Sequence, residues 1–161
     1  MDVGWVDPSA IIDTLYDREN KIIYVFNEFY KPGCQLSELA EAIEKMNLKK
    51  NKLWVDAAEP RTISYFKSQG INAVPCIKGK DSVRMGYQFL QDNLIVVNPK
   101  CQNLINELKN LSYKKSKQTG LYTDEFEDHQ FTHACDGLRY GYSDIYTQTK
   151  LKTISKNALS L

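Results

Sequence analysis

Long hydrophobic runs are missing from this sequence. The longest apolar stretches are residues 22–26 and 94–97, far short of the roughly 20 residues that cross a bilayer. The N-terminus has no basic region followed by an apolar one, so no signal peptide is expected. No CxxC pair occurs among the four cysteines, which are Cys34, Cys76, Cys101 and Cys135. We therefore expect reduced thiols in a reducing compartment and no membrane partner.

Strong charge of one sign and a nucleotide-binding loop are also absent. The formal net charge is +1, so any surface that binds nucleic acid must be local. Residues 77–82, IKGKDS, lack the GxxxxGK[ST] spacing of a P-loop, which excludes an ATP-driven motor in this chain. The 161 residues suit a single domain. We expect that domain to span residues 1–148 and a basic, disordered tail to span 149–161.

Hydrophobic patterning predicts a hairpin followed by alternating helices and strands. Residues 8–17 and 21–30 are rich in β-branched and aromatic side chains and are separated by a short polar turn, which is typical of an antiparallel hairpin. Residues 35–48 have helical spacing, with Gln35 or Ser37 as the cap. The later elements are expected as strand 52–56, helix 59–70, strand 71–78, helix 82–91, strand 92–98, helix 99–111, a polar segment 112–128 with a small hairpin around Gly120, and a last helix 129–148. This order predicts an α/β fold with a mixed sheet, antiparallel first and parallel later, flanked by helices.

Two acidic side chains are candidates for chemistry because of where they fall. Asp56 ends a predicted strand, and ligands bind at the carboxyl ends of strands in open α/β sheets. It also suits a turn or helix-cap role before Pro60. Asp2 lies close to Gly4, which permits an unusual turn, although an N-terminal aspartate is ordinary when taken alone.

The last predicted helix carries an imidazole and a carboxylate on one face. His133 and Asp136 are three residues apart, a spacing that places both on the same side of a helix. His133 is equally compatible with a partly buried structural histidine. Asp136 is equally compatible with a salt bridge to Arg139 or Arg84. The two residues indicate a functional site only if other carboxylates lie close to them in the folded chain.

Convergent carboxylates would need cations, because clustering and burial raise their pKa values. Mg²⁺ prefers such oxygen ligands, and two ions about 4 Å apart hold both the attacking and the leaving oxygen of a phosphodiester. A zinc site built on His129 and His133 is a weaker alternative, because Cys135 would point elsewhere on the helix. The same geometry disfavours a Cys–His nucleophile.

A basic group follows the strand predicted for residues 71–78. Lys78, Lys80 and Arg84 fall close to where Asp56 is expected, a position that suits contact with a phosphate backbone. A solvated surface is the alternative for this group and for the other lysine clusters.

Four sequence blocks carry a family resemblance. They are DVGWVDPSA, KLWVDAAEPRTI, IKGKDSVRMGYQFL and DHQFTHACDGLRYGY, and they occur in this order between about residue 2 and about residue 145. Together they resemble the nuclease domain of tailed-phage terminase large subunits, and most of all the group from phages of Gram-positive bacteria. The resemblance implies a ribonuclease H-like fold and an endonuclease that cuts concatemeric viral DNA during genome packaging.

The resemblance also implies a two-metal site formed by Asp2, Asp56, His133 and Asp136. Asp2 would bridge two Mg²⁺ or Mn²⁺ ions, Asp56 would hold one and Asp136 the other. His133 would be a neutral ligand or a partner of the leaving oxygen, and Lys80 would contact the phosphate of the cut strand. The implied partners are double-stranded DNA and, in the full packaging complex, the terminase ATPase domain, the small terminase subunit and the portal. The implied location is the cytoplasm of the bacterial host cell.

Two other functions remain open from the sequence. One is a catalytically impaired fragment that binds DNA or packaging proteins. The other is a different ribonuclease H-like enzyme, such as a junction resolvase or a transposase, which the DAAEP and LRY motifs disfavour. In the family, a hydrophobic strand and an ATPase half precede the first aspartate, whereas only Met1 precedes Asp2 here. We therefore expect this chain to be a fragment, an excised piece of a terminase or the product of a degenerate prophage.

Overall fold

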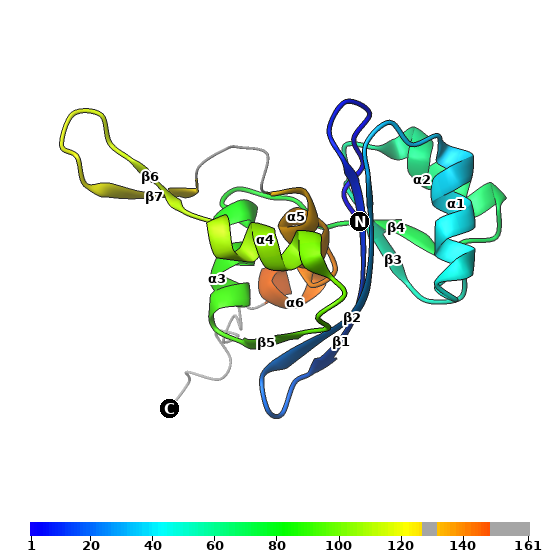
Figure 1. Ribbon diagram of the computed structural model, residues 1–161, viewed down its shortest axis with the longest axis horizontal. Helices are drawn as coiled ribbons and strands as arrows, with labels where there is room; N and C mark the ends of the chain where they lie inside the picture. Colours follow the sequence, from blue (N-terminus) through cyan, green and yellow to red (C-terminus); the bar gives the residue numbers. More distant parts are fainter. Residues whose placement is uncertain (127–131, 149–161) are drawn as a thin grey trace, which may run out of the picture.

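A computed structural model describes residues 1–126 and 132–148, and a twisted hairpin lies at its centre (Figure 1). Strands β1 (Ser9–Asp17) and β2 (Ile22–Lys31) pair antiparallel, with a register shift between Asp13 and Thr14. Strand β5 (Leu94–Val97) pairs parallel to β2 and completes a three-stranded sheet. The predicted α/β fold, with an antiparallel hairpin and a parallel strand in one sheet, is confirmed.

A second, two-stranded parallel sheet lies on one side of the hairpin (Figure 1). It consists of β3 (Leu53–Val55) and β4 (Ala73–Pro75), and it is accompanied by α1 (Leu36–Lys45) and α2 (Pro60–Ser68). Helix α1 begins at a capping box in which the side chain of Glu38 accepts the backbone N–H of Gln35. Buried apolar side chains from both helices and both strands form one core cluster.

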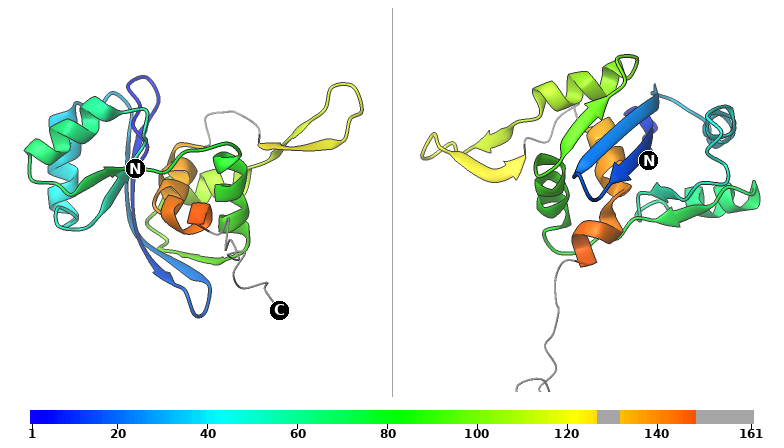
Figure 2. Two further views of the ribbon diagram at one scale, coloured as in Figure 1. Left: turned by 180° about the vertical axis from the view of Figure 1, so that it is seen from behind. Right: turned by 90° about the horizontal axis from the view of Figure 1, so that it is seen from below.

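The remaining helices gather on the other side of the hairpin, as both views in Figure 2 show. They are α3 (Ser82–Gln91), α4 (Gln102–Asn110), α5 (His133–Tyr140) and α6 (Ser143–Gln148). Their apolar faces form a second core cluster with the inward side chains of β1 and β2. The short strands β6 (Tyr113–Lys115) and β7 (Tyr122–Phe126) form the predicted hairpin around Gly120, which projects from the body.

The first two residues lie between β1 and β3. The backbone of Asp2 exchanges two hydrogen bonds of 2.9 Å with Ala10, and the Met1 amine donates to the Trp54 carbonyl at 2.7 Å. Burial lowers the pKa of this amine to about 6. Helix α5 approaches the same place at Gly137, where a Cβ atom would lie 3.3 Å from the Ala10 carbonyl oxygen. The close approach therefore favours glycine, and Asp2 is fixed beside α5.

Two predicted elements are wrong in extent. The single last helix expected over residues 129–148 is interrupted at residues 141–142, and residues 129–131 lie outside the described ranges. The chain turns there because the N–H groups of Gly141 and Tyr142 bond to carbonyls three residues back, at 3.2 and 3.1 Å, instead of continuing the α-helix. The strand expected over 71–78 is reduced to β4, and one further bond of 2.7 Å, from the Cys76 N–H to the Val55 carbonyl, follows Pro75. In the described ranges, no helix has the length and apolar character needed to span a membrane.

Candidate functional site

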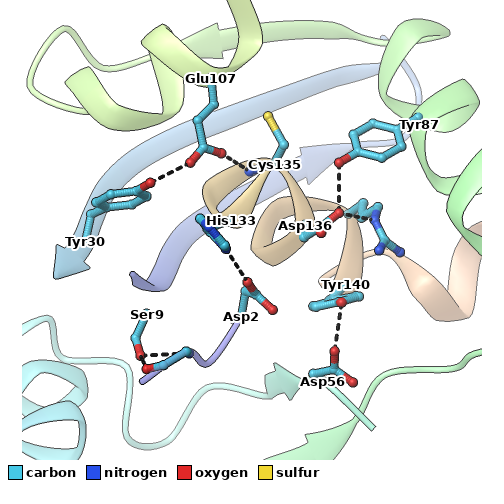
Figure 3. Close-up of polar contacts among 12 residues, drawn as sticks. Asp2, Ser9, Tyr30, Asp56, Tyr87, Glu107, His133, Cys135, Asp136 and Tyr140 are labelled. Carbon is cyan, nitrogen blue, oxygen red and sulfur yellow. Dashed lines mark hydrogen bonds and ion pairs between the residues drawn. The ribbon is translucent and has the colours of Figure 1, made fainter. Parts of the chain in front are cut away.

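Asp56 follows directly after β3 and is held by three donors. Its Oδ1 accepts the Ala58 N–H at 2.7 Å and the Lys78 ammonium at 2.5 Å, and its Oδ2 accepts the Tyr140 hydroxyl at 2.9 Å. Partial burial opposes the charge of Asp56, but Lys78 and the hydrogen bonds outweigh it and lower its pKa. Asp56 therefore has the turn role that its sequence position allowed, because it accepts the N–H two residues later. Its carboxylate faces α5 (Figure 3).

Asp136 lies in the first turn of α5 and is largely buried. Its Oδ1 accepts the Tyr87 hydroxyl at 2.8 Å and the Arg139 Nε–H at 2.6 Å. Burial raises the pKa of Asp136 despite the Arg139 guanidinium, and the nearby charge of Asp2 raises it further. The ion pair to Arg139 that the sequence left open is therefore formed, and it lies inside the protein, since Arg139 is only 4% exposed.

His133 is the first residue of α5, and its side chain contacts the carboxylate of Asp2. Its Nδ1 lies 3.2 Å from Oδ2 of Asp2, and both side chains are 15% exposed. The hydrogen bond to Asp2 raises the pKa of His133, although burial opposes this effect. His133 is thus a largely buried histidine whose partner, Asp2, comes from the other end of the sequence.

The four predicted site residues lie around one helix. Figure 3 shows Asp2, His133, Asp136 and Asp56 arranged along α5, with Tyr140 joining the helix to Asp56. Burial raises the pKa of the Tyr140 hydroxyl; the charge of Arg139 opposes this, and the charges of Asp136, Asp2 and Asp56 add to it. The structure therefore brings segments from three distant parts of the sequence into one acidic neighbourhood.

This neighbourhood is held by internal ion pairs and is not a preformed metal cage. Within residues 1–126 and 132–148, no three His, Cys, Asp or Glu side chains are grouped closely enough to hold one ion. Instead Asp56 is paired with Lys78, Asp136 with Arg139, and Asp2 with His133. The donor set nevertheless fits Mg²⁺ or Mn²⁺, because it offers carboxylate oxygens and one imidazole.

Tyr87 and Tyr140 are site residues that the sequence reasoning missed. Tyr140 follows Asp136 by four residues, so helical spacing already places the two on one face, and this signal was available. Tyr87 comes from α3, and nothing in the local sequence shows that its hydroxyl reaches Asp136. The same holds for Glu107 of α4, which contacts the start of α5.

The predicted basic residues differ in their surroundings. Lys78 lies against Asp56, whereas Lys80 and Arg84 are exposed, the first before α3 and the second within it. The zinc alternative involves His129, which lies outside the described residues. The side chain of Cys135 is fully buried, so it is not available as an exposed ligand beside His133.

Comparison with known proteins identifies the family. The model of the terminase RNAseH like domain matches residues 2–144. The chain belongs to this terminase family. The terminase large subunit of the PBSX phage from Bacillus subtilis (strain 168) is 31% identical over 129 residues, which cover 78% of this chain and 30% of that protein. The large subunit of an Escherichia phage terminase is 28% identical over 153 residues, which cover 90% of this chain and 34% of that protein. The terminase chain thus spans about a third of the length of these curated relatives.

Solved terminase structures confirm the ribonuclease H-like fold. The nuclease domain of the large terminase from bacteriophage SPP1, solved with bound Mn, superimposes with a TM-score of 0.82 at 28% identity, covering 89% of this chain and 82% of that one. A large-terminase nuclease from a thermophilic phage was solved with bound magnesium. The SPP1 nuclease domain, at 28% identity, contains bound Mn.

The Asp2–His133 pair predicts a pH dependence of stability in the metal-free protein. Because the pKa of His133 is raised above its usual value of 6.5, the pair stabilises the fold fully below pH 6.5, and this contribution is lost as the pH rises through the raised pKa. The stability advantage of wild type over His133→Asn should therefore be larger at pH 5.5 than at pH 8.5. Urea unfolding in EDTA at both pH values measures it. An advantage that does not change with pH would show that the pair is not formed.

Proposed function

We propose that this chain is the metal-dependent endonuclease domain of a phage or prophage terminase large subunit, which cuts concatemeric viral DNA during genome packaging. The observation that carries the proposal is the hydrogen bond of 2.9 Å between Tyr140 and Asp56. It fixes the carboxylate at the end of β3 against the helix that carries His133 and Asp136. Membership of the terminase family and the manganese-bound relative support the same function.

Asp2, Asp56, Asp136 and His133 would hold two Mg²⁺ or Mn²⁺ ions. When bound, such ions activate a water molecule and neutralise charge at the attacked phosphate. In our proposal Asp2 would contribute to holding both ions, Asp56 would hold one and Asp136 the other, and His133 would be a neutral ligand or a partner of the leaving oxygen. Tyr87 and Tyr140 each donate a hydrogen bond to a carboxylate and fix its orientation.

Lys78 is paired with Asp56 in the metal-free chain and would be released if that carboxylate held a metal ion. Its ammonium lies 2.5 Å from Oδ1 of Asp56, and its side chain is 41% exposed, so it can turn outward at little cost. There it would join Lys80 and Arg84 in contacting the phosphates of double-stranded DNA. In the full packaging complex, the proposed partners are the terminase ATPase domain, the small subunit and the portal, in the cytoplasm of the bacterial host cell.

Metal removal provides the first test of the nuclease proposal. We expect the purified chain to nick supercoiled plasmid in 5–10 mM Mn²⁺, on the order of the concentrations that saturate weak carboxylate sites, and to lose this activity in EDTA. Gel electrophoresis of the relaxed and linear products measures the rate. Activity that persists in EDTA would contradict the proposal.

A DNA-binding module without catalysis is the rival function. It predicts that the chain retards DNA in a gel but leaves the plasmid supercoiled at every Mn²⁺ concentration. The retained acidic neighbourhood around α5 favours the nuclease.

A further inference from the structure

Glu107 is a buried carboxylate that the proposed reaction does not use. It lies in α4 and is only 2% exposed, so its charge is almost entirely removed from water. Desolvation raises its pKa, although hydrogen bonds partly offset the effect. A buried carboxylate costs free energy unless its oxygens are well satisfied. Its partners therefore indicate what it does.

The carboxylate of Glu107 connects α4, which carries it, to β2 and to α5. Oε1 accepts the hydroxyl of Tyr30, near the end of β2, at 2.9 Å, and Oε2 accepts the backbone N–H of Cys135, in the first turn of α5, also at 2.9 Å (Figure 3). The nearby backbone N–H of Ala134 lowers the pKa of the same carboxyl group. Glu107 is therefore fixed against the sheet on one side and bonds the buried N-terminal turn of α5 on the other.

These contacts place Glu107 in the role of a missing helix cap. The first backbone N–H groups of a helix have no partner within it, and the side chain of the N-cap residue usually accepts one of them. The N-cap residue of α5 is Thr132, whose side chain makes no such bond. Glu107 accepts the N–H that the cap would have taken, and its negative charge suits the positive end of the helix dipole.

The capped turn is the one that carries the proposed metal ligands. His133 and Asp136 lie on either side of Cys135, whose backbone N–H bonds Glu107. We propose that Glu107 is a positioning residue: through its bonds to Tyr30 and to the first turn of α5, it sets where His133 and Asp136 point. This inference rests on the proposed nuclease function, because it concerns the same site. Residues that orient metal ligands typically change metal affinity by 10–100-fold when they are removed.

Three substitutions separate positioning from general stability. Glu107→Ala removes both hydrogen bonds. Glu107→Gln keeps them, because its amide oxygen accepts the Cys135 N–H and its NH₂ group donates to the Tyr30 hydroxyl. Tyr30→Phe removes one bond without touching α5. Ile43→Val in α1 is the matched control, since Ile43 is fully buried in the other core cluster and its truncation lowers stability far from α5.

The first measurement is hydrogen exchange in the metal-free protein, followed by NMR. In Glu107→Ala we expect the Cys135 and Asp136 amides to exchange at least about tenfold faster than in wild type, relative to amides of α1. Glu107→Gln should stay close to wild type, and Tyr30→Phe should fall between. Unchanged exchange in Glu107→Ala would overturn the inference without reference to nuclease activity. Should the alanine variant not fold, the same comparison is made with Tyr30→Phe.

The second measurement is the dissociation constant for Mn²⁺ alone, by titration calorimetry at a temperature where all variants are folded. We expect an increase of about tenfold or more for Glu107→Ala, at most about threefold for Glu107→Gln, and no change for Ile43→Val. Equal affinity in wild type and Glu107→Ala would overturn the inference and leave the nuclease proposal intact. Absence of Mn²⁺ binding in wild type would instead contradict the nuclease proposal, and the metal-positioning role would fail with it.

Discussion

Replacing Asp56 with alanine should lower the Mn²⁺-dependent plasmid-nicking rate by at least about 100-fold, because a metal ion contributes several kcal/mol to transition-state stabilisation and each ~1.4 kcal/mol is a factor of ten. The fold should survive. Lys78 can rehydrate because its side chain is 41% exposed, but the Tyr140 hydroxyl and the Ala58 N–H lose their acceptor, so we expect a loss of about 1–3 kcal/mol in the free energy of unfolding. Initial nicking rates and thermal unfolding of the same preparation give both quantities.

Asp92→Ala is the matched control for this experiment. Asp92 is an exposed aspartate at the end of α3, bonded to Gln88 of the same helix. It should nick plasmid at the wild-type rate. If Asp56→Ala also nicked at that rate, the activity would come from a contaminant or from another site, and the assignment of Asp56 would be wrong.

Replacing Asp136 with alanine should have the largest combined effect on stability and activity. The substitution leaves the buried Arg139 guanidinium without its carboxylate and the Tyr87 hydroxyl without its acceptor. Removing one partner of a buried ion pair lowers the free energy of unfolding by about 3–5 kcal/mol. We expect urea unfolding to show a loss of this size, and nicking to fall below detection at a temperature where the variant is still folded.

A double substitution separates the two roles of Asp136. In Asp136→Ala/Arg139→Met the unpaired charge is removed, so much of the lost stability should return. Nicking should stay absent, because the proposed metal ligand is still missing. A double variant that is stable and nicks DNA would show that Asp136 acts only through the fold and not through metal binding.

The secondary structure was predictable where it depends on local pattern. The hairpin of β1 and β2 follows from β-branched and aromatic residues on both sides of a polar turn, and α1 follows from helical spacing with Gln35 as one of two expected caps. The break at residues 141–142 was not predicted, because helical spacing continues across it. In the structure β3 and β4 form a sheet separate from the larger one, and Met1 and Asp2 lie between β3 and β1. No local sequence pattern indicates this arrangement.

In the candidate site, too, the proposed metal ligands could be predicted from the sequence, whereas the residues that contact them could not. Asp56, His133 and Asp136 stand out through strand-end position and helical spacing, and the family resemblance added Asp2. Their internal partners depend on tertiary contacts. Lys78 was expected to contact DNA, but its pairing with Asp56 appears only in the folded chain. The hydroxyl of Tyr87 and the carboxylate of Glu107 reach α5 from helices that are distant in the sequence.

The central claim is that the carboxylates at the end of β3 and on α5 share divalent cations. Crystals of the chain soaked in Mn²⁺ and measured for anomalous scattering near the manganese absorption edge test it most directly. We expect anomalous density between the carboxyl groups of Asp56 and Asp136, with Lys78 turned away from Asp56. Occupied Mn²⁺ sites confined to other surfaces, with the Lys78–Asp56 and Arg139–Asp136 pairs unchanged, would contradict the claim.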